Sequence, residues 1–435
     1  MTGPGRDGPA ALLGLLGLLG CSTPAGPPPR DASVGDVGPF LDIASAADTA
    51  PAPPPPPPPS EPGRHAVTVE ETRQVVPGPG LPPMAMAGTS NNNLDVVRHG
   101  GRVYLAWRTA PDHFASNRTE IFVVSSPDEV AWTFEARFAA ETDLREPRLL
   151  SFHGALTLYL ARLGTDPLGF DPQGMSRSTR GEDGQWSALT PFYRPGFIPW
   201  RTRVEAGRAY MTAYLGGENI YRFNGLPLQV ELLGSDDGQT WAPVDPARPV
   251  VYEGGGSETD FTLGPDGTLF AVIRNEAGDA SGWGSLVCRA PAGDLARWTC
   301  RHDPRKYDSP LMFWQDGEAY LVGRRHVTED GRYDLGQRSR PHAAQSVAYQ
   351  AAYAIRPKRC SLWRYVQAED RIAYLLDLPS QGDTCFAGIL DGPTPDTRVI
   401  YNYSSPLDGP DLPWNRAQHG PTRIYRHVLR FAPRP

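Results

Sequence analysis

Lysine is nearly absent from this chain: Lys306 and Lys358 are the only two among its 42 cationic residues, and the rest are arginines. Arginine suits bidentate binding of carboxylates, so we expect guanidinium groups to recognise charge. An excess of positive charge is absent too, since the formal net charge is -7. We therefore exclude a polybasic nucleic-acid-binding protein, which would need many cations to displace counterions from phosphates.

Long apolar runs are also missing, and none approaches the ~18 residues of a transmembrane helix. The longest, residues 10–20, is followed by Cys21. The string Leu18-Leu19-Gly20-Cys21 resembles a bacterial lipobox, in which the cysteine is acylated after cleavage. The alternative is an ordinary secretory signal with an incidental cysteine. We predict a lipoprotein signal over 1–21 and a lipid anchor at Cys21. Ser22 resembles the sorting pattern for the outer membrane of a Gram-negative cell envelope.

Residues 22–64 are rich in Pro, Ala, Asp and Ser and include seven consecutive prolines from Pro53 to Pro59. Such a segment buries too little apolar surface to offset its chain entropy. We predict a disordered tether whose proline run is a stiff polyproline II rod.

From residue 65 onward, short alternating runs are separated by Gly, Asp, Asn and Pro turns, with no long helical period. Four tryptophans, Trp132, Trp186, Trp241 and Trp298, recur at intervals of 54, 55 and 57 residues. A second pattern of strand, glycine turn and strand recurs six times. This repetition predicts an all-β fold, a six-bladed β-propeller with four-stranded antiparallel blades over 65–435. The sixth unit lacks a fourth strand, which residues 65–76 can supply to close the ring. We expect a monomer.

The third unit contains the most specific motif. Residues 234–241, GSDDGQTW, resemble the Asp-box of the sialidase superfamily, with Gly at its first position. We expect Asp236 to bond the turn amides, Gly238 to take positive φ and Trp241 to pack between blades. The box is structural and performs no chemistry. The resemblance covers 65–435 and implies the fold, but by itself says little about catalysis.

Connection lengths predict the functional face. The loops between the second and third strands of each unit are long and lie at one end of the ring, where function commonly resides. The pocket should therefore be lined by the ends of second strands and the starts of first strands. The candidate substrate-binding residues at these positions are Arg108, Arg145, Arg201, Asp260, Arg274, Asp308, Arg324, Arg325, Asp383 and Tyr401. The alternative is that they pair with one another as salt bridges.

The sialidase resemblance implies roles for some of these residues. Glu258 and Arg274 match by position the Glu that acts on the nucleophilic Tyr and an Arg of the carboxylate-binding triad. Arg324 or Arg325 matches a second triad Arg. Arg108 can replace the missing first one; the alternative is an incomplete triad. Asp112 is the candidate acid by location.

The expected nucleophile is missing, because Phe386 stands where the family has Tyr. Phenylalanine cannot form the glycosyl-enzyme intermediate. Tyr403 is the candidate replacement, with Tyr401 nearby. We therefore hypothesise a glycoside hydrolase that acts on an acidic or polar glycan; the alternative is a non-catalytic glycan-binding propeller. We expect Arg274 to lie in a wet central well, so that Arg274→Ala weakens ligand binding but hardly affects stability.

Besides Cys21 there are four cysteines, an even number that suits an oxidising compartment. We predict the disulfides Cys288–Cys300, across a hairpin, and Cys360–Cys385, between the fifth and sixth units. The nine histidines show no paired metal spacing, so we expect no metal and no cofactor. The long insertion 327–359 is predicted to fold over the pocket as a lid; the alternative is a mobile surface loop.

Overall fold

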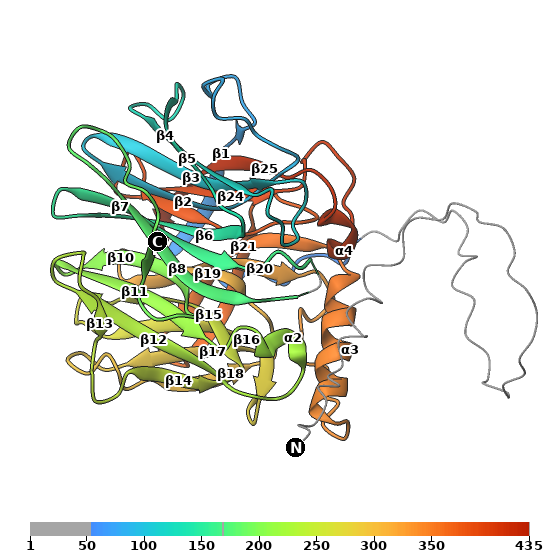
Figure 1. Cartoon of the computed structure of the whole chain (residues 1–435). Helices are drawn as coiled ribbons and strands as arrows, with labels where there is room; N and C mark the ends of the chain where they lie inside the picture. The colour runs from blue at the N-terminus through green and yellow to red at the C-terminus, as the bar shows by residue number, and fades with distance from the viewer. Residues whose placement is uncertain (1–53, 168, 435) are drawn as a thin grey trace, which may run out of the picture. The chain divides into compact units, whose positions relative to one another are not determined.

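The computed structural model describes residues 54–167 and 169–434, and its strands form six antiparallel sheets arranged as the blades of a propeller (Figure 1). The predicted all-β, six-bladed fold is therefore confirmed. The predicted signal 1–21 with Cys21, and the tether up to residue 53, lie outside the described residues. No helix in the described part of the chain is long and apolar enough to cross a membrane.

The first three blades follow the chain in order from the inner strand outward. Blade 1 consists of β2 (Ser90–His99), β3 (Arg102–Ala110), β4 (Glu120–Ser126) and β5 (Thr133–Ala139). Blade 2 consists of β6 (Asp143–Phe152), β7 (Ala155–Leu163), β8 (Pro172–Arg180) and β9 (Thr190–Phe192). Blade 3 consists of β10 (Ile198–Glu205), β11 (Arg208–Leu215) and β12 (Leu228–Ser235), with two short outer strands, β13 (Ala242–Pro243) and β14 (Val250–Gly254).

Two more blades have the same plan. Blade 4 consists of β15 (Gly256–Leu263), β16 (Leu269–Asp279), β17 (Gly282–Ala290) and β18 (Thr299–Asp303). Blade 5 consists of β19 (Asp308–Gln315), β20 (Glu318–His326), β21 (Lys358–Val366) and β22 (Arg371–Asp377). The described helices are α2 (Asn219–Arg222), α3 (His342–Ala354) and α4 (Trp414–Ala417).

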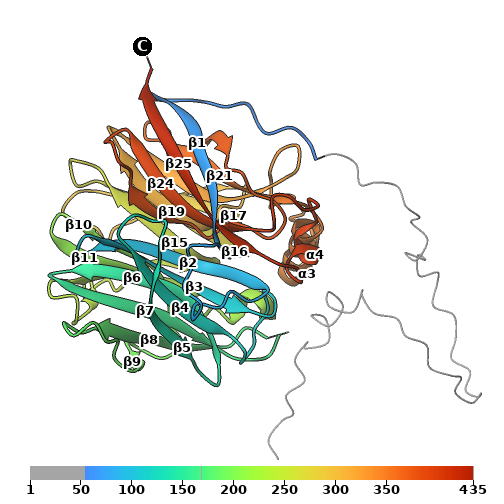
Figure 2. The same ribbon diagram turned by 90° about the horizontal axis from the view of Figure 1, so that it is seen from above.

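Blade 6 combines both ends of the propeller. It consists of β23 (Gly388–Asp391), β24 (Thr397–Ser404), β25 (Arg423–Pro433) and, outermost, β1 (His65–Val76). The pairing of β1 with β25 runs from His65 opposite Pro433 to Val76 opposite Ile424. Figure 2 shows these two strands side by side. The first strand of the propeller thus completes the blade that contains the last one.

The segment just before β1 contacts blade 5. The Glu61 amide donates to the Tyr374 carbonyl (2.8 Å), and Arg371 binds the Glu61 carboxylate through both terminal nitrogens (2.9 and 2.5 Å). The Arg64 amide donates to Glu318 (2.9 Å). The tether was expected to continue to residue 64, whereas bonds to the propeller already begin at Glu61. We call Glu61 and its bonds to Tyr374, Arg371 and Arg364 the N-terminal clasp.

The turn after β12 differs in one residue from the prediction. Asp237, and not Asp236, accepts hydrogen bonds from the amides of Gln239 and Thr240 (2.7 Å each). Asp236 is exposed and pairs with a neighbouring arginine. Gly238 has the expected positive φ of 70°, which favours glycine. Trp241 is buried and donates through Nε1 to the Tyr159 hydroxyl of blade 2 (3.2 Å), so the motif joins two blades.

Both predicted disulfides are confirmed. Cys288 and Cys300 lie opposite each other on β17 and β18, with Cα atoms 4.0 Å apart. Cys360 of β21 is bonded to Cys385, just before β23, with Cα atoms 4.9 Å apart. The second bond joins blade 5 covalently to blade 6.

Candidate functional site

The long connections between second and third strands contain all three described helices. Helix α2 follows β11, α3 follows β20 and α4 follows β24. Figure 1 shows the three helices at the same end of the propeller. We call this end the helical face. The first residues of the inner strands and the last residues of the second strands lie at this end.

The first five inner strands each contain a register shift near their start. The shifts fall between Asn92 and Leu94, Arg145 and Arg148, Pro199 and Arg201, Gly256 and Thr259, and Asp308 and Leu311. Three shifts contain a non-glycine residue at positive φ: Asn93 (42°), Glu146 (52°) and Ser309 (54°). Such a bulge changes the direction of neighbouring side chains and is frequent next to functional sites. We call these positions the inner bulges.

Arg274, at the helical end of β16, binds two carboxylates. Its Nη1 lies 2.8 Å from Glu258 Oε1 and 3.0 Å from Glu276 Oε2, and its Nε donates to the Ser257 hydroxyl (3.1 Å). Arg274 is only 7% exposed. The expected wet well is therefore wrong for this residue, because its side chain is enclosed by protein and paired with other side chains.

The cluster continues into blade 5 through Lys306, one of the two lysines of the chain. Its ammonium group donates to Glu276 (2.8 Å) and lies 3.3 Å from Asp308 Oδ1. Asp308 Oδ2 also accepts from the Tyr353 hydroxyl of α3 (2.6 Å) and from Arg324 Nη1 (3.3 Å). These residues are all buried. Helix α3, part of the predicted lid, is thus bonded directly to the ion network.

Arg324 links this cluster to blade 6. Its Nη2 donates to the Tyr403 hydroxyl (3.2 Å), and that hydroxyl donates to Asp383 Oδ1 (3.1 Å). The other oxygen of Asp383 lies 2.8 Å from His113 Nδ1. Tyr403 and Asp383 are buried, whereas the His113 side chain is 18% exposed. A continuous buried network therefore runs from Arg274 to His113 and joins blades 4, 5 and 6 to a loop of blade 1.

Glu258 and Asp308 have opposite pKa shifts within this network. Burial raises the pKa of Glu258 to about 7; Arg274 opposes this change, while the charges of Asp308 and Glu146 add to it. Burial acts in the same direction on Asp308, but Lys306, Arg324 and Arg274 outweigh it and lower its pKa to about 2. The Ser309 amide donates to Glu258 Oε2 (2.7 Å). Glu258 is thus a carboxyl that can hold a proton at neutral pH, next to one that stays ionised.

A second cluster lies between blades 1 and 2. Arg108 binds both oxygens of Asp143 (3.0 and 3.2 Å) and is fully buried. Arg145 binds the same carboxylate from Nε (2.6 Å). Asp112 accepts the amide of Phe114 (2.9 Å) and so stabilises its own loop. In the described structure the Asp112 carboxylate is therefore bonded within its own loop and not to Glu258 or Tyr403.

Arg201, Asp260 and Phe386 fill the centre of the ring. Arg201 of blade 3 donates to the carbonyls of Pro310 in blade 5 and Ala387 in blade 6 (3.0 and 2.7 Å). Asp260 accepts from Arg203 through both oxygens (2.6 Å each) and lies 4.0 Å from Arg201 Nε. Phe386 is 2% exposed, and its ring lies under the guanidinium groups of Arg148 and Arg201. These three predicted residues therefore hold the blades together at the axis.

Two further candidates lie away from the network. Arg325 points to the outer part of its own blade and binds Asp377 (3.0 and 2.6 Å). Tyr401 is buried and donates to Glu129 (2.8 Å), in the turn of blade 1 opposite the helical face. We therefore leave both out of the proposed site.

Sequence reasoning did not select four members of the network, Glu276, Lys306, His113 and Tyr353. Glu276 lies within β16, beyond the residues that pair with β15, and His113 lies in the long loop after β3; spacing gives no signal for either position. Lys306 could have been selected, because a lysine in a chain that otherwise uses arginine is a signal in itself. Glu146, half-buried at an inner bulge, acts on Glu258 through its charge and bonds Asn93 (2.9 Å).

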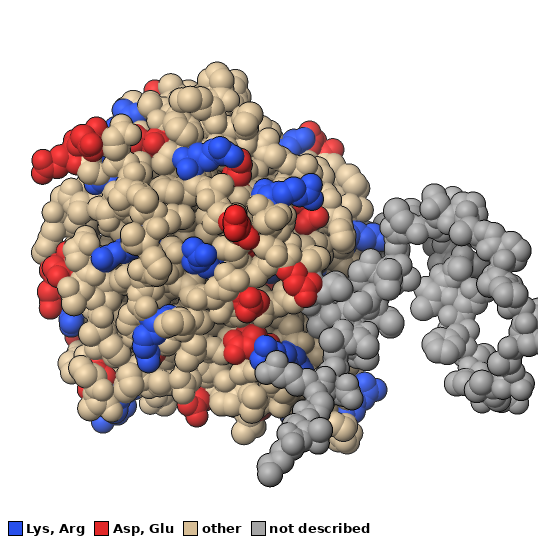
Figure 3. Space-filling view, in the orientation of Figure 1, with Lys and Arg blue, Asp and Glu red and all other residues tan. Residues whose placement is uncertain are grey.

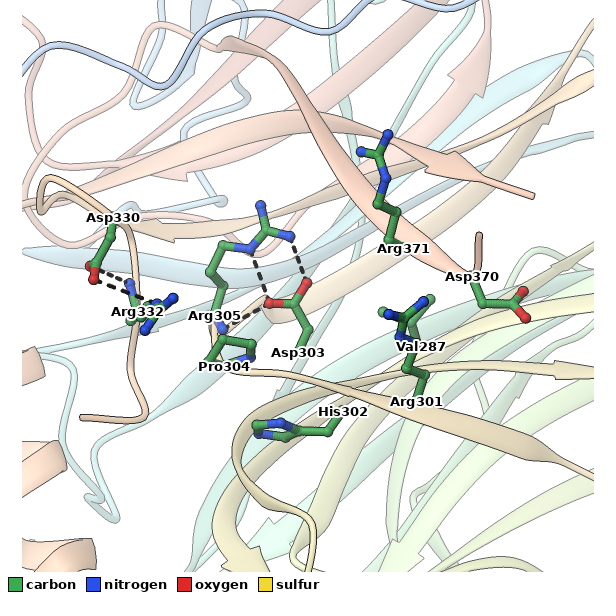
Figure 4. Close-up of a pocket in the computed structure, with 10 residues that line it drawn as sticks. All are labelled: Val287, Arg301, His302, Asp303, Pro304, Arg305, Asp330, Arg332, Asp370 and Arg371. Atoms are coloured by element: carbon green, nitrogen blue, oxygen red, sulfur yellow. Dashed lines mark hydrogen bonds and ion pairs between the residues drawn. The ribbon is translucent and has the colours of Figure 1, made fainter. Parts of the chain in front are cut away.

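A surface pocket of about 390 Å³ lies apart from the network, between blades 4 and 5 (Figure 4). Its lining includes four arginines: Arg301, Arg305, Arg332 and Arg371. Arg305 is bound to Asp303 (3.0 and 2.6 Å) in the middle of Figure 4, with Arg332 and Arg371 on either side. Because Arg371 is also bound to Glu61, much of this positive charge is neutralised.

The remaining described surface and side chains give little sign of a metal or polyanion site. Within 54–167 and 169–434, no three His, Cys, Asp or Glu side chains are grouped to hold a metal ion. On the face shown in Figure 3, positive and negative side chains are interspersed. The buried network is therefore the main concentration of charge that we describe.

Known proteins resemble this chain in structure. No protein-family model matches the sequence, and neither does any curated protein. A protein of unknown function from Dyadobacter fermentans aligns with a TM-score of 0.56 and 15% identity, over 84% of this chain and 99% of its own. Trypanosoma rangeli sialidase aligns with a TM-score of 0.51 and 11% identity, over 79% of this chain. A Penicillium chrysogenum α-L-arabinanase aligns with a TM-score of 0.49 and 13% identity, over 82% of this chain and 98% of its own.

At these identities the likeness shows the fold alone. The chain spans about half of the sialidase, since the match covers 55% of that protein. The fold is therefore that of a propeller similar to a sialidase, and any activity has to be argued from the site.

Proposed function

We propose that the protein is a glycoside hydrolase that acts on an acidic or polar glycan at the helical face. The observation that carries this proposal is Glu258, a nearly buried carboxyl with a pKa of about 7 that is held between Arg274 and the Ser309 amide. A carboxyl with this pKa can give up and take back a proton near neutral pH, as the acid in glycoside hydrolysis must.

Glu258 is proposed to protonate the leaving glycosidic oxygen, and Glu146 to act as the second carboxylate. Two carboxyl groups on either side of the scissile bond are the usual requirement for this reaction. Glu146 is oriented by Asn93 and is close enough to influence the pKa of Glu258. Arg274 and Arg324, which both lower the pKa of Asp308, supply positive charge for an acidic sugar. This assignment uses neither Asp112 nor Tyr403 as a proton donor or nucleophile.

The second candidate is a glycan-binding propeller without turnover. It is favoured by Phe386, a buried ring at the position where sialidases have their nucleophilic Tyr, and by Tyr403, whose hydroxyl is occupied by Arg324 and Asp383. Without a nucleophile a retaining mechanism fails. An inverting mechanism with two carboxylates and water is still open to this chain.

The location is part of the same proposal. We propose that a lipid on Cys21 holds the protein at the cell envelope, in the outer membrane of a Gram-negative bacterium, as a monomer. Labelling with a radioactive fatty acid tests the anchor: we expect label on the full chain and none on Cys21→Ala. Label that survives the substitution would refute the lipobox.

A screen of the full chain against chromogenic glycosides and a glycan array tests the activity. We expect turnover of at least one substrate, its loss in Glu258→Gln, and retained glycan binding by that variant. Glu253→Gln, on the outer strand of blade 3, is the matched control and should leave turnover unchanged. Binding without turnover by the unmodified chain would select the second candidate, and neither binding nor turnover would refute both.

A further inference from the structure

Arg148, on inner strand β6, is a fully buried arginine without hydrogen bonds. Among the described residues, none accepts a hydrogen bond from its Nε, Nη1 or Nη2. Arg108 is equally buried, yet each of its three nitrogens donates to a carboxylate, amide or carbonyl oxygen. Buried polar groups in folded proteins are almost always bonded, so a guanidinium group with no protein partner requires another acceptor.

The surroundings of Arg148 supply donors and aromatic rings. Its guanidinium carbon lies 4.2 Å from the ring centre of Phe386 and 5.1 Å from that of Trp200. Trp200 is also buried, and its Nε1 has no partner in the described chain. Because Arg148, Trp200 and Phe386 come from blades 2, 3 and 6, they meet at the centre of the ring.

Arg148 is charged but is not hydrogen-bonded to any of the acids near it. Burial, followed by the neighbouring Arg201, lowers the pKa of Arg148 to about 9, so the group is still protonated at neutral pH. Among the acids whose charges act on Arg148, Asp95 accepts the Leu149 amide through Oδ2 (2.8 Å), and burial raises its pKa. Asp260 is bound to Arg203 and lies 4.0 Å from Arg201 Nε, and Glu146 accepts from Asn93. The acids near Arg148 are therefore bonded to other groups, and none of them accepts a hydrogen bond from its guanidinium group.

We propose that a small monovalent anion, chloride in the cell, binds at the free edge of the Arg148 guanidinium on the propeller axis. An anion accepts hydrogen bonds and offers none, which fits a place where the free groups are donors. A water molecule would have to direct its own hydrogens to acceptors, and the two rings beside Arg148 offer none of the usual kind. This site is independent of the proposed glycosidase activity.

Crystals of the full chain grown in sodium bromide test the position of the ion. We expect an anomalous peak at the bromine edge within hydrogen-bond distance of the Arg148 nitrogens. Ordered water in that place without an anomalous signal would overturn the proposal.

Thermal unfolding in sodium chloride and in sodium gluconate at equal ionic strength tests the ion in solution. A ligand that binds only the folded state raises Tm in a saturable way. We expect such a rise with chloride, and at least a tenfold higher half-saturating concentration in Arg148→Met and in Trp200→Phe. Trp200→Phe keeps the ring and removes the N–H, so it remains informative if Arg148→Met does not fold.

Arg118→Met, at an exposed arginine without side-chain bonds among the described residues, is the control and should respond like the unmodified chain. Equal responses to chloride and gluconate in all four proteins would refute the site.

Discussion

Replacing Arg274 by alanine should destabilise the propeller strongly and in a pH-dependent way. The substitution removes the guanidinium group that lies 2.8 Å from Glu258 and 3.0 Å from Glu276. Removing one partner of a buried pair costs about 3–5 kcal/mol, because a charge is left buried without compensation. Glu276 keeps Lys306 at 2.8 Å, which places the expected loss near the lower limit, at about 3 kcal/mol at pH 8.

The sign of the pH dependence follows from Glu258. Its folded pKa of about 7 lies above the ordinary value of 4.5, so the folded state holds a proton that the unfolded state releases. Unfolding free energy therefore falls as pH rises from about 4.5 to 7. At pH 5 Glu258 is neutral, and Arg274→Ala then loses mainly its bond to Glu276, about 1.5 kcal/mol. Because Arg274 lowers the pKa of Glu258, the variant should continue to lose stability above pH 7.

Urea unfolding followed by tryptophan fluorescence at pH 5 and pH 8 measures both effects. Arg118→Ala serves as the exposed control and should change the unfolding free energy by less than ~0.5 kcal/mol at either pH. A loss below 1 kcal/mol at pH 8, or the same loss at both pH values, would show that Arg274 is not part of a buried ion network. The earlier expectation of an Arg274 exposed in a wet well would then be restored.

Three further predictions concern other parts of the fold. The double variant Cys360→Ser, Cys385→Ser should lose about 3 kcal/mol of unfolding free energy in urea, as expected for a closed loop of this length; an unchanged midpoint would contradict this. Phe386→Ala should lose about 3–5 kcal/mol, because a buried ring under two guanidinium groups is removed; a loss below 1 kcal/mol would exclude its structural role. Trypsin cleavage after the exposed Arg332 and Arg338 of insertion 327–359 should slow when glycan is bound; an unchanged rate would refute the lid.

The propeller could be predicted from the sequence because its information is local and repeated. Each Trp after a polar turn marks the same place in successive blades, and Trp241 packs between blades 2 and 3 as the pattern predicts. Both disulfides followed from the hairpin register and from the count of remaining cysteines. These features depend on turn chemistry and on strand alternation, both of which can be read directly from the chain.

The site could be predicted only in part, because its partners come from different blades. The helical face and the position of Glu258 beside Arg274 followed from strand ends. The inner bulges could not be predicted from the sequence, because Asn93, Glu146 and Ser309 take positive φ and no glycine marks these positions. As each bulge changes the direction of its neighbours, the sequence could not show that Arg201 would bond backbone carbonyls across the axis or that Asp260 would bind Arg203.

The N-terminal clasp has a mechanical consequence. A pulling force that reaches the propeller along the chain from residue 60 first acts on Glu61, which is held by Arg371 and by the Tyr374 carbonyl on blade 5. The force therefore passes into blade 5, and from there through the Cys360–Cys385 bond into the start of blade 6. The pairing of β1 with β25, on which closure of the ring depends, is stretched only after the clasp opens. A propeller built in this way resists being unwound by a force applied on the N-terminal side of Glu61.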